Sequence, residues 1–546
     1  MATAKKKKKA PRAKRQYTLE EGVRLSESLI WNLQRAYYNK EGIEAWKSGT
    51  VPSYITTNAF IAGAYARVLH AHLIDVAREA EGEAPTVHII ELGAGHGRFG
   101  FLVLKKLTQL LKLSPAKAAP FCYVMTDLVE KNVAFWGSHS FLKPFIDRGL
   151  LDFACYDVEK DTELKLKLSS KTISAENRTQ SMAVIANYVF DSLTVDVFQV
   201  AEGQLRESLI TVKSTKRSEK DLDDPAVIDR ISVAYQHQEV DGDTYDVPEL
   251  NRILRIYSEL LGDTSFLLPI GTLRGIRTLE DMCDGQMLIL SADKGYNHAH
   301  QLLGQSPPSL VKHGSFSFSV NYHAIGLYFR ERGGFSLHTS ERSGSIEVSA
   351  FVLKGTPADN HQTCLSFQRE VEDLGPVDFF LLQRDANKLE GTPSLEYCLS
   401  LLRLSGWDPE IFYDLRIYMR DQAEAAHSDT QQEVARAMAK VWDLFYFLGN
   451  DRDVPFAMGR IFHRMGQYHQ AIHYYQHSVR LLGDDRATFY NIGLCHYKVG
   501  QSAAALHYFD KSLEVDATYS FARDWKLRVQ AEMRKSGASW DATSTP

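Results

Sequence analysis

The sequence predicts an α/β domain, with helices on both faces of a mostly parallel sheet, followed by a module made only of helices. The first observation is a short apolar run, Val87 to Leu92, which ends in glycines and precedes a helical stretch. The second is that further strand-like runs alternate with helical or loop stretches up to about residue 354. The third is that the strand signal stops after about Asp385, where only helical patterns continue.

Length and composition exclude several classes of protein. A chain of 546 residues has room for two to four domains, and 44% hydrophobic with 24% charged residues is an ordinary globular mixture. No apolar stretch is long enough to span a membrane, so we expect no membrane association. The six cysteines are far apart and form no C-x-x-C pair, which favours a reducing compartment and a cytoplasmic location.

The charge is uneven along the chain. Eight Lys and Arg residues and no acid lie within residues 1–15, so without them the net charge of −5 becomes −13 for the other 531 residues. We therefore expect residues 1–15 to be a basic disordered tail, and the alternative is a targeting segment. The acidic remainder argues against nucleic-acid binding by the folded body and confines any such binding to the tail.

Residues 16–85 are predicted to form a helical N-terminal segment that packs on the domain after it. Apolar residues recur there at spacings of three and four, first at Leu29, Leu33 and Tyr37. The sheet domain is predicted over residues 86–385, with an antiparallel β insertion. Its parallel strands are expected at 87–92, 121–126, 151–156, 183–186 and 287–291, and antiparallel strands at 209–246 and 314–354.

The helical end contains an internal repeat of small residues. The residues that recur 34 positions apart are Gly459 and Gly493, Gly466 and Gly500, and Ala471 and Ala505. This pattern resembles the tetratricopeptide repeat, in which two antiparallel helices cross closely at small residues. The resemblance implies two repeats over 452–525, a helical connection with a degenerate copy over 386–451, and a helix end and tail over 526–546. Because stacked repeats present a concave surface, we expect a protein substrate or partner to dock there.

The segment Glu91 to Arg98 carries the main sign of a cofactor. Gly93, Gly95 and Gly97 follow a strand and precede a helix, so the backbone can approach a ligand that faces the helix N–H groups. A dinucleotide fingerprint would need glycine where Arg98 stands, which disfavours a nicotinamide-dependent oxidoreductase. The pattern E-x-G-x-G-x-G resembles the first motif of S-adenosylmethionine-dependent methyltransferases. That resemblance implies that Glu91 helps to hold the amino acid end of S-adenosylmethionine.

Two acids follow the next strands in order along the chain. Asp127 ends the second strand, where a carboxylate can accept hydrogen bonds from both hydroxyls of a ribose. Asp157 follows the third strand, where class I methyltransferases commonly contact the adenine amino group. The alternative for Asp157 is a solvated loop acid.

The fourth strand ends in Asn187 to Val195, and ligands of an open parallel sheet bind at such ends. This segment is similar to the N-E-x-x-D-A-L-P-V signature of the MidA family, which includes mitochondrial complex I assembly methyltransferases. Residues 52–58 resemble that family's threonine segment over the cofactor, which implies that Thr56 and Thr57 bind it. Residues 288–296 look like the family's D-Y-G-Y strand end.

The resemblance covers roughly residues 25–385. It implies a Rossmann-like class I methyltransferase sheet, S-adenosylmethionine as the cofactor and a protein substrate, with arginine methylation as the activity ascribed to the family. Two departures bear on this activity: Tyr188 replaces the family acid, and Lys294 replaces a tyrosine of the D-Y-G-Y strand end. A missing carboxylate weakens the arginine assignment, because a guanidinium needs anionic partners.

We expect Asn187, Tyr188 and Asp191 to be the catalytic residues, with Tyr188 and Asp191 orienting the substrate and Asp191 serving as any base. Asn187 is also expected to contact the cofactor. Asn187-x-x-Phe190 resembles, without its prolines, the N-P-P-Y/F loop of methyltransferases that act on planar nitrogens, which leaves an amide as a second acceptor. No metal site is expected. The alternative function is a catalytically silent scaffold that binds the cofactor and acts through its repeats.

Overall fold

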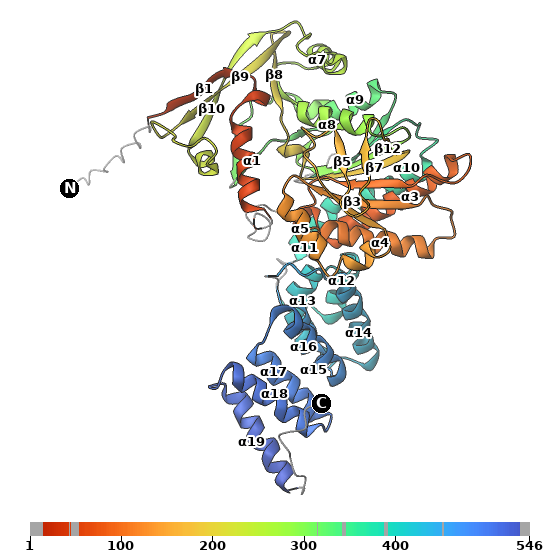
Figure 1. Ribbon diagram of the computed structural model, residues 1–546, viewed down its shortest axis with the longest axis vertical. Helices are drawn as coiled ribbons and strands as arrows, with labels where there is room; N and C mark the ends of the chain where they lie inside the picture. Colours follow the sequence, from red (N-terminus) through yellow and green to blue (C-terminus); the bar gives the residue numbers. More distant parts are fainter. Residues whose placement is uncertain are drawn as a thin grey trace, which may run out of the picture. The chain divides into compact units, whose positions relative to one another are not determined.

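The computed structural model divides the chain into two units, which Figure 1 colours along the sequence. The first unit consists of the residues up to Asp378 except Asn58–Gly63. The second unit consists of Asn58–Gly63 and the residues from Phe379 onward. The described residues are 15–42, 44, 54–313, 315–340, 346–386, 391–449 and 452–535. The predicted basic tail, except Arg15, lies outside them, as do residues 52–53 of the threonine segment and residues 536–546.

Within the described residues, the first unit is built around a sheet of seven strands. In spatial order the strands are β17 (Phe335–His338), β18 (Glu347–Leu353), β12 (Met287–Asp293), β7 (Ser181–Asn187), β2 (Val87–Glu91), β3 (Phe121–Asp127) and β4 (Leu151–Cys155). The five strands from β12 to β4 are parallel, and β17 and β18 pair antiparallel at one edge. The α/β fold class predicted from the sequence is therefore confirmed.

Helices cover both faces of this sheet. In Figure 1, α4 (Arg98–Leu113) and α5 (Glu130–Ser138) lie below it, whereas α8 (Ile270–Asp281) and α9 (Tyr322–Glu331) lie above it. Every residue of β12 is buried, as expected for a parallel strand that is covered on both sides.

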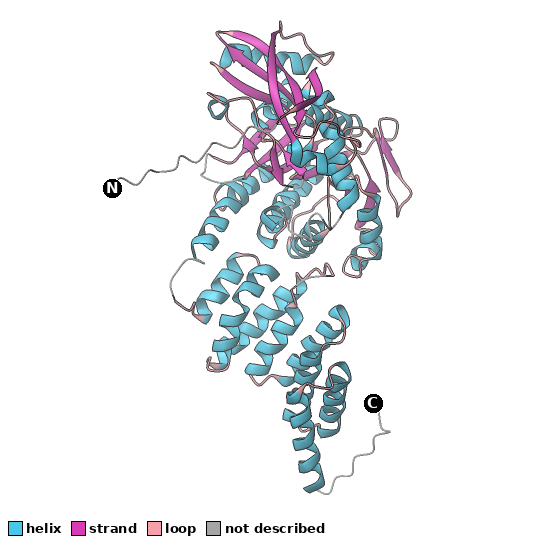
Figure 2. Ribbon diagram, turned by 90° about the vertical axis from the view of Figure 1, so that its left-hand side faces the viewer, coloured by secondary structure: helices cyan, strands magenta, loops and turns pink. Residues whose placement is uncertain are grey.

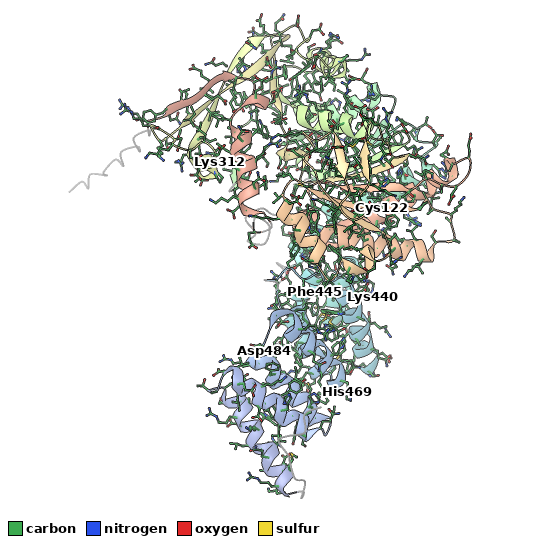
Figure 3. The ribbon with its side chains drawn as sticks, viewed as in Figure 1. Cys122, Lys312, Lys440, Phe445, His469 and Asp484 are labelled. Atoms are coloured by element: carbon green, nitrogen blue, oxygen red, sulfur yellow. The ribbon has the colours of Figure 1, made fainter. Side chains whose placement is uncertain are left out.

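A second, antiparallel sheet packs within the same unit. Its strands are β1 (Tyr17–Val23), β9 (Gln204–Ser214), β8 (Asp196–Ala201), β11 (Thr264–Leu268) and β10 (Ile231–Glu239). The expected hairpin between 209 and 246 is present as β9 and β10. Trp31 of α1 (Ile30–Glu41) packs beside the sheet against the rings of Phe316 and Phe318. Lys312 of β14 (Val311–His313), which Figure 3 labels, donates to the carbonyl oxygen of Ile231.

Two expectations about local structure are wrong. The segment 16–85, predicted to be helical, begins with the strand β1, which pairs with β9 almost two hundred residues later. The stretch 314–354, predicted as antiparallel strands, contains the helix α9 between short strands and the β17–β18 pair. In the remaining N-terminal segment, α1 and α3 (Ala59–Glu79) are helices as expected.

Only helices occur in the described residues of the second unit, which Figure 2 draws in cyan. They are α12 (Leu395–Leu404), α13 (Pro409–Ala423), α14 (Ser428–Asp443), α15 (Val454–Arg464), α16 (Tyr468–Leu482), α17 (Arg486–Lys498), α18 (Ser502–Val515) and α19 (Ser520–Lys535), preceded by the end of α11 (Pro376–Ala386). The first turn of α3 belongs to this unit, because Ala59 N–H donates to Asp408 Oδ2 at 2.8 Å and Phe60 stacks on Phe379.

The repeated small residues stand where the helix pairs cross. A Cβ on Gly459 would lie 2.6 Å from the ring of Tyr475, and one on Gly493 would lie 2.7 Å from the ring of Phe509. Equivalent residues of the two repeats therefore make equivalent contacts. None of the described helices of either unit has the length and apolar character needed to cross a membrane.

Candidate functional site

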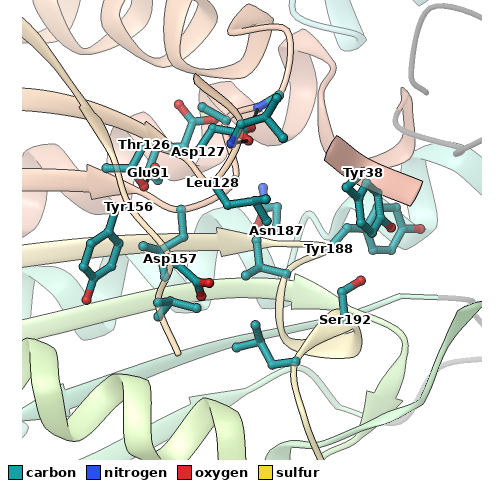
Figure 4. Close-up of a pocket in the computed structure, with 18 of the residues that line it drawn as sticks. Tyr38, Glu91, Thr126, Asp127, Leu128, Tyr156, Asp157, Asn187, Tyr188 and Ser192 are labelled. Atoms are coloured by element: carbon teal, nitrogen blue, oxygen red, sulfur yellow. Dashed lines mark hydrogen bonds between the residues drawn. The ribbon is translucent and has the colours of Figure 1, made fainter. Parts of the chain in front are cut away.

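The carboxyl ends of β2, β3, β4 and β7 open into one pocket of the first unit (Figure 4). The predicted site residues that line it are Thr56, Thr57, Glu91, Gly93, Gly95, Asp127, Asp157, Asn187 and Tyr188. Gly97 and Asp191 are not among its lining residues. Parallel strands explain why side chains far apart in the sequence meet here, since their carboxyl ends share one edge of the sheet.

The glycine turn has the left-handed backbone that its sequence predicted. Gly93, Gly95 and Gly97 have φ angles of 61°, 54° and 79°. A Cβ on Gly97 would lie 2.6 Å from Met125 and 3.0 Å from Trp136, so this glycine allows α4 to start against β3 and α5. Gly93 and Gly95 are the two that face the pocket.

Asp127 holds the shape of this turn. Its Oδ2 accepts the backbone N–H of Gly95 at 3.0 Å, and its Oδ1 accepts that of Val129 at 2.9 Å. The indole N–H of Trp136 donates to the carbonyl oxygen of Gly95 at 3.0 Å. Burial raises the pKa of Asp127 to about 6, although the hydrogen bonds to its carboxylate oppose the shift.

Glu91 is a buried acid at the start of the turn. Its Oε2 accepts the hydroxyl of Tyr123 at 3.0 Å, and no described Lys, Arg or His pairs with it. Burial raises the pKa of Glu91 to about 8. Gly100 makes room for this carboxyl, because a Cβ there would lie 2.5 Å from Oε2. Among the described residues of the site, Glu91 is therefore a carboxyl group without a cation.

Asp157 forms part of a charged cluster with helix α1. The guanidinium of Arg35 pairs with Asp157 Oδ2 and, at 2.6 Å, with Glu159 Oε2. The other oxygen, Oδ1, accepts the backbone N–H of Glu159 at 3.1 Å. Arg35 lines the pocket with its neighbour Gln34, and we did not predict either residue to be in the site. They lie off the apolar stripe of α1 that the sequence pattern identified, and a polar helix face alone gives no signal of a ligand.

Asn187 and Tyr188 lie where β7 ends. The side-chain oxygen of Asn187 accepts the hydroxyl of Tyr65 at 3.0 Å, and its amide donates to the carbonyl oxygen of Thr56 at 3.4 Å. Tyr188 has a φ of 51°, which is uncommon for a residue with a side chain, and its N–H donates to Ala292 at 3.0 Å. Such strain is concentrated at functional sites.

In Figure 4, Tyr38 of α1 lies at the same end of the pocket as Tyr188. Burial raises the pKa of Tyr38 to about 12, and the charge of Asp191 contributes. Tyr38 is a third residue of α1 at the site that the sequence analysis missed.

Asp191 and Asp293 are neighbours at this end of the pocket. The backbone N–H of Asp191 donates to Asp293 Oδ2 at 3.1 Å, and the hydroxyl of Ser192, which lines the pocket, donates to Asp191 Oδ1 at 2.8 Å. Burial and the charge of Asp191 raise the pKa of Asp293 well above its usual range. We did not predict Asp293 as a site residue, although it ends β12 next to β7 and lies in the segment that resembles D-Y-G-Y.

Comparison with known proteins gives two family matches. Residues 69–270 match the model of a family described as "Putative S-adenosyl-L-methionine-dependent methyltransferase", and residues 455–518 match that of the tetratricopeptide repeat. No curated protein matches the chain. The family matches confirm the predicted resemblance, the repeats and S-adenosylmethionine as the cofactor.

Solved structures also resemble this chain. An uncharacterized Burkholderia thailandensis protein is 13% identical, with 62% of this chain and 90% of that chain covered and a TM-score of 0.38. A second protein of its superfamily from that organism, bound to S-adenosyl-homocysteine, is 12% identical. The match covers 59% of this chain and 93% of that chain, with a TM-score of 0.33. Magnesium protoporphyrin IX methyltransferase from Synechocystis, with bound S-adenosyl-homocysteine, is 11% identical. The match covers 59% of this chain and 98% of that chain, with a TM-score of 0.26.

Proposed function

Because residues 69–270 belong to this methyltransferase family, we propose that the protein methylates a side-chain nitrogen of another protein, with arginine as the favoured acceptor. When bound, S-adenosylmethionine supplies a methyl group on a sulfonium, which a nucleophile displaces in line. Positioning and exclusion of water then account for most of the rate that this chain must provide.

The pocket residues fit the cofactor. Glu91 is a buried carboxyl without a cation, and the amino group at the methionine end of the cofactor would supply one. Asp127 is fixed by two backbone N–H groups, and its remaining lone pairs can accept the ribose hydroxyls. Gly93 and Gly95 allow the backbone to approach the ligand, and Thr56, whose carbonyl oxygen accepts a hydrogen bond from the amide of Asn187, also lines the pocket.

The observation that carries the arginine proposal is the pair of carboxyls at Asp191 and Asp293. Tyr188 stands where the family has an acid, and Asp191 puts a carboxylate back at the same end of the pocket, beside Asp293, whose pKa burial raises well above its usual range. A guanidinium that entered past Tyr38 and Tyr188 would meet Asp191 first, with Asp293 buried behind it. In this proposal Asp191 orients the acceptor and takes its proton.

An amide acceptor is less well supported. The N-P-P-Y/F mode needs a side-chain carbonyl that is free to accept from the acceptor NH₂ group. The side-chain oxygen of Asn187 already accepts the hydroxyl of Tyr65, which leaves one lone pair, and its amide already donates to the carbonyl oxygen of Thr56. Asn187 therefore supports the shape of the pocket in this proposal.

The repeats are proposed to bind the protein substrate or a partner, because stacked repeats present an extended concave surface. Nucleic-acid binding by the basic tail and a cytoplasmic location stay predictions from the sequence. The scaffold is the alternative function, and the replacement of the family acid by Tyr188 favours it.

The experiment is to incubate the full-length protein with radiolabelled S-adenosylmethionine and cell lysate, and then to separate the proteins on a gel. We expect a labelled band that yields methylarginine after acid hydrolysis. Asp191→Asn should lower labelling at least tenfold, about 1.4 kcal/mol of transition-state stabilisation, and leave cofactor affinity within a few-fold. Label on another residue type would refute the arginine proposal. No label, with cofactor binding intact by calorimetry, would favour the scaffold.

A further inference from the structure

A second pocket of the first unit, with a volume of about 450 Å³, shares no lining residue with the first. It lies between α9, β17 and the short helix η5 (Ala299–Leu302). Basic side chains from all three segments converge on it: His298, His300, His323, Arg330 and His338. Nothing in the proposed methyl transfer uses these residues.

The convergence follows from the periodicities of the two larger elements. His323, Gly326 and Arg330 are spaced by three and four on α9 and therefore share one face of the helix. Ser336 and His338 are two apart on β17 and share one face of the strand. A Cβ on Gly326 would lie 3.1 Å from the hydroxyl of Ser336, so this glycine lets helix and strand approach and leaves the space above them open.

Arg330 is exposed, like Arg274 on α8, and has no acidic partner among the described residues. Its neighbours at the end of α9 differ in this respect, since Glu331 pairs with Arg252 at 2.6 Å and Arg332 pairs with Glu280 at 2.7 Å. The acid next to the pocket, Glu347, accepts hydrogen bonds from Asn297 and Thr339. The positive charge of Arg330 is therefore not neutralised within the described part of the chain.

The histidines present hydrogen-bonded rings to the same space. His338 contacts the hydroxyls of Ser349 and Ser336, each at 2.9 Å, and His323 Nδ1 contacts the hydroxyl of Tyr257 at 2.9 Å. Burial lowers the pKa of both His323 and His338 to about 4, and Arg330 and the other histidines add to the shift. No carboxylate is among the groups that shift either pKa.

A metal ion does not fit this arrangement. Among the residues that the structure describes, no three His, Cys, Asp or Glu side chains are placed to hold one. An arginine fork with hydroxyl, amide and imidazole groups around it instead matches the several oxygens of a tetrahedral anion. We propose that this pocket binds a phosphate group, either as inorganic phosphate or as the phosphate of a small monoester.

The first test is calorimetry of the full-length protein with inorganic phosphate and, separately, with glycerol phosphate. We expect one binding site. If the natural ligand is a phosphate monoester, glycerol phosphate should bind more tightly than inorganic phosphate. Arg330→Gln should weaken binding at least tenfold and leave S-adenosylmethionine affinity unchanged. The matched control is Arg274→Gln, which removes an equal charge from an exposed position on α8 and should change affinity less than twofold.

The second test uses sulfate, whose charge is constant between pH 8 and pH 6. Its affinity should rise as the pH falls, because a bound anion raises the pKa of His323 and His338 and the complex takes up protons. His338→Gln should reduce this dependence. Absence of anion binding, or equal losses in the Arg330 and Arg274 variants, would overturn the proposal. A sulfate affinity that does not change with pH would show that the histidines do not take up protons when the anion binds.

Discussion

The backbone N–H of Gly95 donates a 3.0 Å hydrogen bond to Asp127 Oδ2, which ties the glycine turn to the end of the neighbouring strand. Asp127 thus has two tasks in the proposed function, because it fixes the turn and can also accept the ribose hydroxyls. The two tasks can be separated by substitutions that differ in what they leave behind.

Asp127→Asn should weaken S-adenosylmethionine binding by about 1 to 3 kcal/mol, since one oxygen remains for a backbone N–H but the charge is lost. Asp127→Ala should weaken it more and should also lower the melting temperature, because two backbone donors lose their partner. Calorimetry and thermal unfolding measure the two effects. Unchanged cofactor affinity in both variants would contradict the assignment of this pocket.

Cofactor binding should release protons near pH 7. The pKa of Glu91 is raised to about 8 by burial, so its carboxyl is mostly protonated in the free protein at pH 7. A cationic amino group beside it would lower that pKa and release the proton. Calorimetry in buffers of different ionisation enthalpy should detect up to about one proton released, and Glu91→Gln should abolish the release. A wild-type protein that releases no proton would show that the cofactor's amino group lies elsewhere.

The sequence could predict the part of the site that one βαβ unit builds. The run from Val87 to Glu91 and the glycines after it determine the turn locally, and Asp127 ends the next strand, so both follow from strand order alone. Arg35 could not be predicted, because it reaches the pocket only through packing of α1 against distant segments.

The two errors in local structure have similar causes. The strand β1 is partly polar and only partly buried, and its pairing with β9 is fixed by tertiary contacts. The helix α9 is apolar over almost all of its length and carries aromatic and β-branched residues, which are also typical of strands. In each case the sequence pattern fits two local structures, and packing decides between them.

Arg35→Gln should weaken cofactor affinity, although the side chain of Arg35 is partly exposed. Its loss leaves Asp157 and Glu159 facing each other at the edge of the pocket without their shared cation. Like-charge repulsion should then displace the loop after β4. We expect a several-fold loss in affinity that is larger at low salt, measured by calorimetry at two ionic strengths. A loss that does not depend on salt would contradict the electrostatic role.

The backbone of Tyr188 should be strained, so substitutions that differ in backbone freedom should differ in stability while both lose activity. At a φ of 51°, an alanine keeps the backbone strain and a glycine removes it. Tyr188→Gly should therefore be more stable than Tyr188→Ala by about 1 kcal/mol in thermal unfolding. Both variants should lose labelling of the acceptor, because both lack the ring. Equal stability of the two variants would show that the backbone relaxes without cost.

The close helix crossing at Gly459 gives a prediction for the repeats. A methyl group there would lie 2.6 Å from the ring of Tyr475, which is buried, so Gly459→Ala should destabilise the repeats by about 1 to 3 kcal/mol. Gly466→Ala is the matched control, because its Cβ meets nothing within 4 Å and it has only the strain of a φ of 72°.

Limited proteolysis should cut the Gly459→Ala protein faster between α15 and α19, with S-adenosylmethionine affinity unchanged. If docking on the repeats delivers the substrate, labelling of that protein should fall in parallel, whereas methylation of a short arginine peptide should not. Equal labelling of the protein by wild type and Gly459→Ala, despite faster proteolysis, would show that the repeats take no part in substrate delivery.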